Sequence, residues 1–479
     1  MLHREMLIAG HFIGGPCDQA VGKVQIYAPY SSKIVGTAAE GGLDEAMAAI
    51  SAAADAFDAF KNTPRSTRMH LLRQIAQLVR EREEELVEVL TLEVGKPVTW
   101  SRGEVARLAI TFDLAADQLS TYGFESMPLD FDPRGEGYTC RVERFPVGPI
   151  FCIVPYNWPF NLAAHKMAPA LATGNTIVLK PSDLSPLSTF TLARIIHEAG
   201  CPPGVLNAIL VPAPIAEKMA MDARIKMVSF TGSPGVGWHL KNICADKKVT
   251  LELGGDASAI VCEDADLDWA TSRLVAGGYG YAGQVCISVQ HVLAHERVYG
   301  SLKAKLIDAT NACPTGDPSD PATVCGPLIS SAAADKVMSF VDEAVAAGAT
   351  VLAGGKREGN MVWPTLIENV PEGTKLDREE VFGPVLTLSS YSLLEHALKK
   401  VNSSQYGIQC GVFTHDETYA EQAFRTLEVG GVIIDDYPTL RFDNFPYGGV
   451  KRSGFGREGV RYAMDDMTEP KTLVTRARP

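Results

Sequence analysis

The amino-acid sequence predicts an α/β fold made of two units that share a cleft. Its 479 residues exceed what one hydrophobic core usually serves, so two or more packed units are expected. Between residues 148 and 252, strand-like and helix-like stretches alternate, which is the pattern of a parallel sheet covered by helices. The alternation starts again after Gly255, which predicts a second α/β unit.

The region before residue 148 is expected to be mainly helical. Apolar residues recur at helical spacing over 43–60, 66–92 and 98–120, against a charged background. The first two stretches therefore predict long surface helices, and the third predicts a helix with one apolar stripe. After residue 121 the pattern changes to short segments broken by proline and glycine, followed by a predicted strand at 138–144.

The two α/β units have the following expected elements. In the first unit we expect strands at 149–154, 176–180, 205–211, 226–230 and 248–253, and helices at 163–172, 186–199, 213–221 and 235–244. In the second unit we expect strands at 257–262 and 289–296 and helices at 266–277, 300–310 and 331–347. Ligands of such sheets bind at the carboxyl ends of the strands, where Asn157, Lys180, Ser233 and Glu252 fall.

Charge and composition narrow the function classes. A net charge of −13 and a pI near 5.3 argue against a nucleic-acid or anionic-membrane surface, because both reward clustered Lys and Arg. The first ten residues are too short and too charged for a signal peptide, and no apolar run reaches membrane-spanning length. We therefore expect a cytoplasmic protein that acts on small molecules.

Cysteine usage predicts free thiols and no metal site. The ten cysteines are scattered, with no Cys-x-x-Cys pair and no His-Cys cluster at metal-ligand spacing. Cys286 is singled out by its small, polar, glycine-containing setting in residues 283–288, near an expected helix start where a thiolate would be stabilised. A structural cysteine is the alternative interpretation.

Two polar residues near expected strand ends have the chemistry of a covalent enzyme. Glu252 ends a strand before two glycines, so it could reach a cleft with little steric cover, although the pattern fits a surface carboxylate equally well. Asn157 stands in a rigid loop between two prolines and two aromatic residues, from which its amide could reach a developing oxyanion. Helix capping is the competing role for Asn157.

Two further strand ends could bind a dinucleotide. The turn Phe230-Thr-Gly-Ser-Pro-Gly-Val-Gly237 follows a strand and opens a helix, so its free N–H groups could meet a pyrophosphate. It is not the usual G-x-G-x-x-G, and an ordinary strand-to-helix connection explains it as well. Lys180 could bind ribose hydroxyls while Asp183 discourages a 2′-phosphate, although solvated loop charges would look the same.

Taken together, these segments resemble the NAD(P)-dependent aldehyde dehydrogenase superfamily in order and in spacing, over essentially the entire chain. Within it, the sequence looks most like the branch acting on lactaldehyde, semialdehydes and phosphonoacetaldehyde. The matching motifs are Pro155-Tyr-Asn-Trp-Pro159, Pro169-Ala-Leu-Ala-Thr-Gly-Asn175, Lys180-Pro-Ser-Asp183, Phe230-Thr-Gly-Ser233, Leu251-Glu-Leu-Gly-Gly255, Gly283-Gln-Val-Cys286, Glu380-Val-Phe-Gly-Pro384 and Pro446-Tyr-Gly-Gly-Val-Lys451. The co-occurrence of these motifs favours the functional interpretation of each one.

The resemblance implies a three-part subunit. A Rossmann-type cofactor domain would comprise residues 1–125 and 147–254, and an α/β catalytic domain would comprise 255–450. A small β oligomerisation ribbon would comprise 126–146 and 466–479 and would build a homodimer or a homotetramer.

The resemblance also implies a mechanism. Cys286 would attack the aldehyde carbonyl, and the Asn157 amide and the Cys286 N–H would hold the oxyanion of the thiohemiacetal. After oxidation, the thioester would be hydrolysed by water that Glu252 deprotonates. Lys166 matches a family lysine near the oxyanion. A CoA-acylating dehydrogenase is the alternative, followed by a non-catalytic binding protein on this fold.

The cofactor implied is NAD, with NADP as the alternative because Asp183 is shorter than the Glu usual in NAD-preferring relatives. Lys180 matches the ligand of the adenosine ribose, Ser233 that of the pyrophosphate and Glu380 that of the nicotinamide ribose. The full implied set is Lys180, Ser182, Asp183, Phe230, Gly232, Ser233, Gly237, Glu380 and Phe382.

The pocket implied by the resemblance is partly aromatic and partly basic. It comprises Arg107, Trp158, Asn161, Leu162, His165, Val285, Ile287, Tyr437, Arg441 and Tyr447. A guanidinium of Arg107 or Arg441 could pair with an anionic group on a short aldehyde. The competing interpretation makes both arginines salt-bridged surface residues. Val285 weakens the anionic hypothesis, because several anion-selective relatives carry Arg there. Asp256 and Asp435 also depart from the family pattern.

Overall fold

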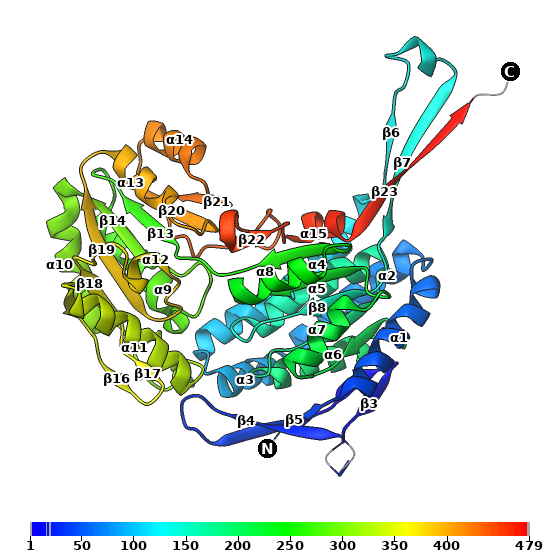
Figure 1. The fold of residues 1–479 in the computed structure, drawn as a ribbon, viewed down its shortest axis with the longest axis horizontal. Helices are drawn as coiled ribbons and strands as arrows, with labels where there is room; N and C mark the ends of the chain where they lie inside the picture. The colour runs from blue at the N-terminus through cyan, green and yellow to red at the C-terminus, as the bar shows by residue number, and fades with distance from the viewer. Residues whose placement is uncertain (1, 16, 19–20, 477–479) are drawn as a thin grey trace.

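Two sheets of different strand order form the body of the protein, and a small antiparallel sheet projects from it (Figure 1). The computed structural model describes residues 2–15, 17–18 and 21–476. Both large sheets have parallel centres, as the alternating sequence pattern predicts, and the antiparallel strands lie at the edges.

The first sheet has eight strands in the order β22-β12-β11-β8-β9-β10-β2-β3. Its five parallel strands are the five predicted ones, at β8 Ile150–Ile153, β9 Ile177–Lys180, β10 Leu206–Ala208, β11 Met227–Thr231 and β12 Lys248–Glu252. The antiparallel edges are β2 Met6–Ile8, β3 His11–Ile13 and β22 Gly454–Phe455. Sequence patterns missed these edges because two or three residues are too few to show alternation.

Helices surround this sheet, and all except the last of them lie close to predicted positions. They are α1 Leu43–Phe60, α2 Arg65–Glu81, α3 Glu83–Val94, α4 Val98–Thr121, α5 Pro159–Thr173, α6 Pro186–Glu198, α7 Ala213–Met221, α8 Pro234–Ile243 and α15 Val460–Asp466. The prediction of one helix over 66–92 is wrong. The chain leaves helical geometry at Arg82, with φ −112° and ψ 24°, so α2 and α3 are separate helices.

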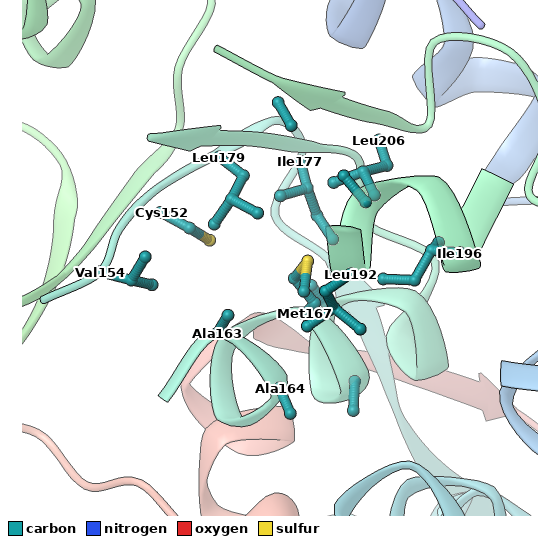
Figure 2. Close-up of a cluster of buried hydrophobic side chains, with 14 of the residues drawn as sticks. Cys152, Val154, Ala163, Ala164, Met167, Ile177, Leu179, Leu192, Ile196 and Leu206 are labelled. Atoms are coloured by element: carbon teal, nitrogen blue, oxygen red, sulfur yellow. The ribbon is translucent and has the colours of Figure 1, made fainter. Parts of the chain in front are cut away.

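The core between sheet and helices is one continuous hydrophobic cluster. Figure 2 shows Met167 of α5 and Leu192 of α6 packed beneath strand residues such as Ile177 and Leu179. These four side chains are fully buried. Burial of this kind contributes roughly 25 cal/mol per Å² of apolar surface. It holds the start of α5, and the loop before it, against the carboxyl ends of the strands.

The second sheet has seven strands in the order β15-β18-β19-β14-β13-β20-β21. The strands are β13 Ser258–Val261, β14 His291–His295, β15 Thr350–Ala353, β18 Thr365–Glu368, β19 Val385–Tyr391, β20 Gln409–Phe413 and β21 Gly431–Ile434. The helices of this unit are α9 Leu267–Tyr279, α10 Glu296–Ala312, α11 Ser331–Ala346, α12 Lys375–Arg378, α13 Leu394–Asn402 and α14 Glu417–Thr426. Only β15 is antiparallel to its neighbour, at one edge.

The projecting sheet joins residues far apart in the sequence (Figure 1). Its strands are β6 Phe124–Met127, β7 Tyr138–Pro146 and β23 Thr468–Arg476, and β23 pairs with β7 along its whole length. Large apolar side chains on it are exposed, including Phe124 at 64% and Leu473 at 52%.

The remaining elements are small. A three-stranded sheet combines β1 Leu2–Arg4, β4 Gly22–Tyr27 and β5 Ile34–Glu40, and a hairpin combines β16 Arg357–Glu358 and β17 Met361–Val362. Three 3₁₀ turns lie at Pro133–Gly135, Gly280–Gly283 and Lys451–Ser453. Across the described ranges 2–15, 17–18 and 21–476, every helix is too short or too polar to cross a bilayer.

Candidate active site

A cavity of about 330 Å³ lies where both units meet the start of α4. Four segments line it: the start of α4, the turn that opens α5, the turn around Cys286, and the loop before Tyr447. The lining residues are Thr99, Trp100, Gly103, Arg107, Asn157, Trp158, Asn161, Leu162, Val285, Cys286, Ile287, Tyr437, Thr439, Leu440, Arg441 and Tyr447. The fold thus brings together most of the predicted nucleophile, oxyanion and pocket residues.

Cys286 lies in a turn, and the expectation of a helix start at this residue is wrong. The preceding 3₁₀ turn Gly280–Gly283 carries Tyr281 and Ala282 at φ 52° and 53°, in the left-handed region. The Cys286 Sγ atom lies 3.1 Å from the Tyr447 hydroxyl. Burial raises the pKa of the thiol to about 12, although the Tyr447 hydrogen bond opposes this. The free site therefore holds a neutral thiol, because no helix start stabilises the thiolate.

Asn157 is tied to the segment that carries the cysteine. Its Nδ2 group donates to the Gln284 carbonyl at 2.9 Å, two residues before Cys286, and the side chain is buried. The capping alternative is wrong, because the residue at the N-cap of α5 is Trp158. An amide Nδ2 has two hydrogens, so one of them is left for a ligand in the cavity.

Glu252 ends β12 as a buried and unpaired carboxyl group. It is 3% exposed, and within the described part of the chain both of its oxygens are without a hydrogen-bond partner. Burial raises its pKa well above the ordinary value, and the nearby charge of Glu458 raises it further. A Cβ atom at Gly448 would lie 2.6 Å from its Oε1, so glycine there leaves room for the carboxyl group.

Lys166 belongs to a buried charge network behind the cavity. Its Nζ donates to Glu458 Oε1 at 3.0 Å and to the Ser229 hydroxyl at 3.2 Å, and Arg441 Nη2 donates to Glu458 Oε2 at 3.0 Å. Burial alone would raise the pKa of Glu458, but Lys166 and Arg441 outweigh burial and hold it at about 2. Sequence reasoning missed Glu458, because a lone Glu after glycine-rich sequence carries no signal of burial.

The two predicted arginines are both paired, but neither lies free on the surface. Arg107 forms a two-point contact with Asp443, at 3.1 Å from Nε and 2.6 Å from Nη2. Arg441 is nearly buried, stacks 3.7 Å from the centre of the Tyr447 ring, and pairs with Glu458. The salt bridges of the competing interpretation are therefore confirmed, but its surface position is wrong for Arg441.

His165 is a correction to the predicted pocket. It is not among the described residues that line the cavity, and it is fully buried on α5. Its Nε2 lies 2.8 Å from Asp443 Oδ1, so it supports the carboxylate that holds Arg107. Burial lowers its pKa, with a further lowering from Arg441. The sequence does not say which side of α5 a residue faces. His165 faces the layer behind the cavity and not the cavity itself.

Five lining residues escaped the sequence reasoning: Thr99, Trp100, Gly103, Thr439 and Leu440. A signal was available for the first three. Gly103 and Trp100 precede Arg107 by one and two helical turns, so a pocket role for Arg107 implies the same face for them. The other two lie in an irregular loop, where sequence spacing does not predict direction.

Most of the predicted cofactor residues lie at or just after the ends of β9 and β11. Ser233 is the N-cap of α8, so the first N–H groups of this helix are available to a pyrophosphate. Gly237 allows close packing, since a Cβ there would lie 2.3 Å from Leu253 Cδ2, and a Cβ at Gly232 would lie 2.6 Å from the Phe230 ring.

Lys180 and its loop lie at the end of β9. Lys180 Nζ donates to Asp183 Oδ1 at 2.8 Å and to the Pro181 carbonyl at 3.0 Å, and the Ser182 hydroxyl accepts from the Leu184 N–H. The lysine is buried, whereas the Asp183 side chain is 63% exposed. The pair therefore presents one ammonium and one carboxylate at a strand end of the same sheet as Ser233.

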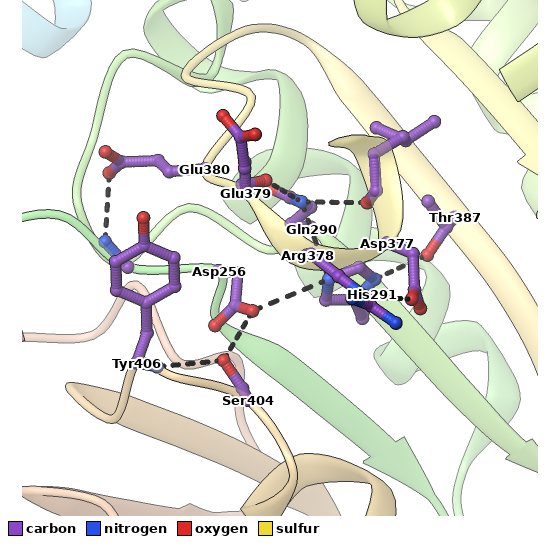
Figure 3. Close-up of polar contacts among 12 residues, drawn as sticks. Asp256, Gln290, His291, Asp377, Arg378, Glu379, Glu380, Thr387, Ser404 and Tyr406 are labelled. Carbon is purple, nitrogen blue, oxygen red and sulfur yellow. Dashed lines mark hydrogen bonds and ion pairs between the residues drawn. The ribbon is translucent and has the colours of Figure 1, made fainter. Parts of the chain in front are cut away.

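Glu380 and Phe382 come from the second unit, and Figure 3 shows how their loop is held. Glu380 Oε1 accepts from the Gly255 N–H at 3.1 Å, and burial raises the pKa of this carboxyl group to about 7. The Gln290 side chain donates to the carbonyls of Leu376 and Glu379 and accepts from the Val381 N–H. Phe382, at φ 53°, meets the Tyr156 ring edge-on at 6.2 Å.

The two unusual aspartates have different environments. Asp256 accepts from the Ser404 hydroxyl at 2.6 Å and lies 4.0 Å from His291 Nε2, as Figure 3 shows, and burial raises its pKa to about 6. Asp435 has a φ of 54°, in the region where Asn and Asp are the commonest residues after glycine. Neither residue is among those that line the cavity.

Comparisons with known proteins identify the family of this chain. The model of the aldehyde dehydrogenase family matches residues 17–473. A 3-sulfolactaldehyde dehydrogenase from Priestia aryabhattai is 38% identical over 467 residues, covering 97% of each chain. A lactaldehyde dehydrogenase from Methanocaldococcus jannaschii is 38% identical over 451 residues, covering 93% of this chain and 96% of that protein.

A solved structure is similar over nearly the whole chain. Aldehyde dehydrogenase 21 from Physcomitrella patens, in complex with the reaction product succinate, has a TM-score of 0.96 and 39% identity. The match covers 99% of this chain and 98% of that one. Other matching structures hold NADP or NAD. The chain therefore belongs to the aldehyde dehydrogenase family and is an NAD(P)-dependent oxidoreductase of aldehydes.

Proposed function

We propose that this enzyme oxidises a short anionic aldehyde to its acid through a covalent Cys286 intermediate. The observation that carries the proposal is the single cavity in which the Cys286 thiol and the Asn157 amide meet two arginines. The thiol and the amide provide the chemistry at the aldehyde end. The arginines provide a site for the other end of the substrate.

The first chemical step would be attack of the Cys286 sulfur on the carbonyl carbon. The thiol proton must leave as the C–S bond forms, and Glu252, when ionised, is the candidate acceptor. The oxyanion of the thiohemiacetal would accept hydrogen bonds from Asn157 Nδ2 and the Cys286 N–H. Lys180, Ser233 and Glu380 would hold a nicotinamide dinucleotide, which would supply the oxidising chemistry as the hydride acceptor.

The second step would be hydrolysis of the thioester. Water adds to the acyl carbon while Glu252 takes its proton, and the Cys286 sulfur leaves and regains a proton. The raised pKa of Glu252 supports this role, because a stronger base removes a proton from water more readily. Lys166 and Glu458 would hold a fixed charge field behind Glu252 rather than touch the substrate.

The charges around the cavity favour a substrate with one negative charge. Arg107, Arg441 and Lys166 pair with two carboxylates, those of Asp443 and Glu458, and burial favours the neutral form of Glu252 by raising its pKa. Across the described ranges, Arg441 Nε is buried without a hydrogen-bond partner. An anionic group at the far end of the substrate would satisfy this donor and the excess charge.

The relatives divide on the substrate. The Priestia enzyme is named for a sulfonated aldehyde, and the Physcomitrella structure holds the dicarboxylate succinate, whereas the Methanocaldococcus enzyme is named for uncharged lactaldehyde. The first two support an anion site, and the third defines the neutral comparison that a test must include.

The test compares short aldehydes that differ only in a terminal carboxylate, sulfonate or methyl group. We expect kcat/KM to be highest for an anionic member, and Arg441→Gln to lower it for the anions by roughly 10- to 100-fold, the loss of a charged hydrogen bond. The methyl compound should change little. Equal losses for all three would contradict the anion site.

A matched control is Arg224→Gln. Arg224 forks onto Asp222 as Arg107 forks onto Asp443, but neither Arg224 nor Asp222 is among the described residues that line the cavity. It should leave the preference among the aldehydes unchanged.

Further assays decide between hydrolysis and CoA acylation. A carboxylate base is needed for water and not for a thiol such as CoA, so turnover without CoA is expected. Activity that requires CoA would favour the alternative enzyme. Retained oxidation by Cys286→Ala would contradict the covalent mechanism altogether.

We also propose that NAD is preferred over NADP. The exposed Asp183 carboxylate beside Lys180 would repel a 2′-phosphate on the adenosine ribose. Asp183→Ser should then raise kcat/KM for NADP and leave that for NAD nearly constant. An unchanged ratio would remove Asp183 from the selection.

We propose finally that the projecting sheet assembles a homodimer or a homotetramer. Exposed apolar residues on it, such as Phe124, Phe131 and Leu473, support burial against a second copy. Light scattering of wild type and Leu473→Asp should show a loss of assembly in the variant. A monomeric wild type would contradict the proposal.

A further inference from the structure

A fully buried ion pair lies directly behind the cavity wall. It joins Lys96, in the turn between α3 and α4, to Glu104 on α4, and both side chains have 0% exposure. Buried ion pairs are weak stabilisers, because desolvation costs several kcal/mol per ion and an apolar pair is often equally stable. The mechanism proposed above does not use either residue. Their contacts point to a different role.

The Glu104 carboxylate holds the start of α5. Its Oε1 accepts from the backbone N–H groups of Phe160 at 2.9 Å and Asn161 at 3.1 Å. These are the second and third residues of the helix, and Asn157 precedes the helix by two residues. Glu104 therefore determines where α5 begins and how the Asn157 turn enters it.

The Lys96 ammonium lies between two aromatic rings from different segments. It is 3.9 Å from the centre of the Trp158 ring and 4.6 Å from the centre of the Tyr281 ring. Trp158 follows Asn157 in the oxyanion turn, whereas Tyr281 begins the left-handed segment that leads to Cys286. Lys96 thus contacts both the turn that carries Asn157 and the segment that leads to Cys286.

We propose that Lys96 and Glu104 are positioning residues that fix the Asn157 amide relative to the Cys286 sulfur. The proposal rests on the proposed function of these two groups. Asn157 reaches the cysteine segment through the Gln284 carbonyl, and Lys96 holds the same two segments together from behind. The pair contacts the segments that carry Asn157 and Cys286, so it acts on the oxidation step and not on cofactor affinity. A displacement of about 1 Å between reacting groups can cost roughly 100-fold in rate.

The main test is the double variant Lys96→Met with Glu104→Gln. Met fills a similar volume without charge, and the Gln oxygen can still accept from the N–H groups of α5, so the variant keeps the helix start. Single-turnover reduction of the nicotinamide at saturating aldehyde should fall roughly 10- to 100-fold, the size of a lost oxyanion contact. The KM for the cofactor should stay within about twofold of wild type.

A cycle with Asn157→Ala separates positioning from general damage. If the pair acts through Asn157, adding the double variant to Asn157→Ala should lower the single-turnover rate no further. An equal loss in both backgrounds, or an unchanged rate in the wild-type background, would overturn the proposal. Cys286→Ala tests the proposed function separately, because retained oxidation there would remove the covalent mechanism whatever Lys96 does.

Two further variants guard against misfolding. If the double variant does not fold, Glu104→Gln alone can be measured near pH 9, since burial lowers the pKa of Lys96 to about 8 even with Glu104 present.

The control is Glu93→Gln. Glu93 is a buried carboxyl group that accepts from Leu187 and Ser188 at the start of α6, away from the cavity. It should leave the single-turnover rate unchanged, and an equal rate loss there would reduce the Glu104 effect to a general property of buried caps.

Discussion

Removal of the Tyr447 hydroxyl should make Cys286 harder to ionise. This hydroxyl lies 3.1 Å from the sulfur, in a site where burial already raises the pKa of the thiol to about 12. A hydrogen bond to a charged group is worth about 1.5–3 kcal/mol, and about 1.4 kcal/mol corresponds to one pKa unit. Tyr447→Phe should therefore raise the thiol pKa by about one to two units.

The assay is alkylation of Cys286 by iodoacetamide between pH 8 and 10, without cofactor and followed by peptide mass spectrometry. Only the thiolate reacts, and at pH 9 a pKa of about 12 leaves roughly one sulfur in a thousand ionised. A higher pKa lowers this fraction at every pH below it. Tyr447→Phe should therefore react roughly 10- to 100-fold more slowly than wild type at each pH.

The matched control is Tyr391→Phe. Tyr391 also places its hydroxyl beside a buried sulfur, 3.5 Å from Cys262 Sγ, in the second unit. This variant should leave the alkylation rate of Cys286 at the wild-type value. An unchanged or faster rate in Tyr447→Phe would refute the assignment of thiolate stabilisation to this hydroxyl.

Three other substitutions test neighbouring parts of the site. Glu252→Gln should slow the burst of nicotinamide reduction, because the Cys286 thiol loses its proton acceptor, and should lower steady-state turnover by roughly 100-fold or more; unchanged turnover would contradict both roles of Glu252. The folded-state pKa of Glu252 is raised, so burial of this group destabilises the fold as the pH rises above the unfolded pKa of about 4.3. Glu252→Gln should therefore raise the melting temperature at pH 8 but not at pH 4. Gly254→Ala would place a Cβ 2.3 Å from Glu380 Oε2 and displace this carboxyl group. The KM for the cofactor should then rise roughly tenfold, which corresponds to about 1.4 kcal/mol of lost binding free energy. An unchanged KM would argue against Glu380 as a ribose ligand. Gln290→Leu leaves the Leu376 and Glu379 carbonyls without their donor, which should lower both the melting temperature and cofactor affinity; a change in the melting temperature alone would limit Gln290 to a structural role.

Regular parts of the fold could be predicted because their patterns are local. The five parallel strands of the first sheet are confirmed, since buried parallel strands are continuous apolar runs that end in turn residues. The break at Arg82 could not be predicted. The residues around it suit a helix, and the separation of α2 from α3 depends on how each packs on α4.

The sequence identified the residues of the site but did not predict the environment of their side chains. The motifs that contain Cys286 and Asn157 are short and ordered along the chain, so resemblance locates them. Resemblance does not give the ionisation or hydrogen bonding of these residues. The thiol pKa, for example, depends on burial and on Tyr447, 161 positions further along the chain. The expected stabilised thiolate and the capping role of Asn157 were both local inferences, and both failed for that reason.

The sequence by itself determined the family, the order of strands and helices in the first unit, and the residue types available for thiol and carboxylate chemistry. Tertiary structure alone decided which charges meet. Arg107 lies on Asp443, Arg441 and Lys166 share Glu458, and Lys96 lies between the oxyanion turn and the cysteine turn. The physical reason is that ionisation and hydrogen bonding depend on distance and burial in space, and these pairs are separated by up to 336 positions in the chain.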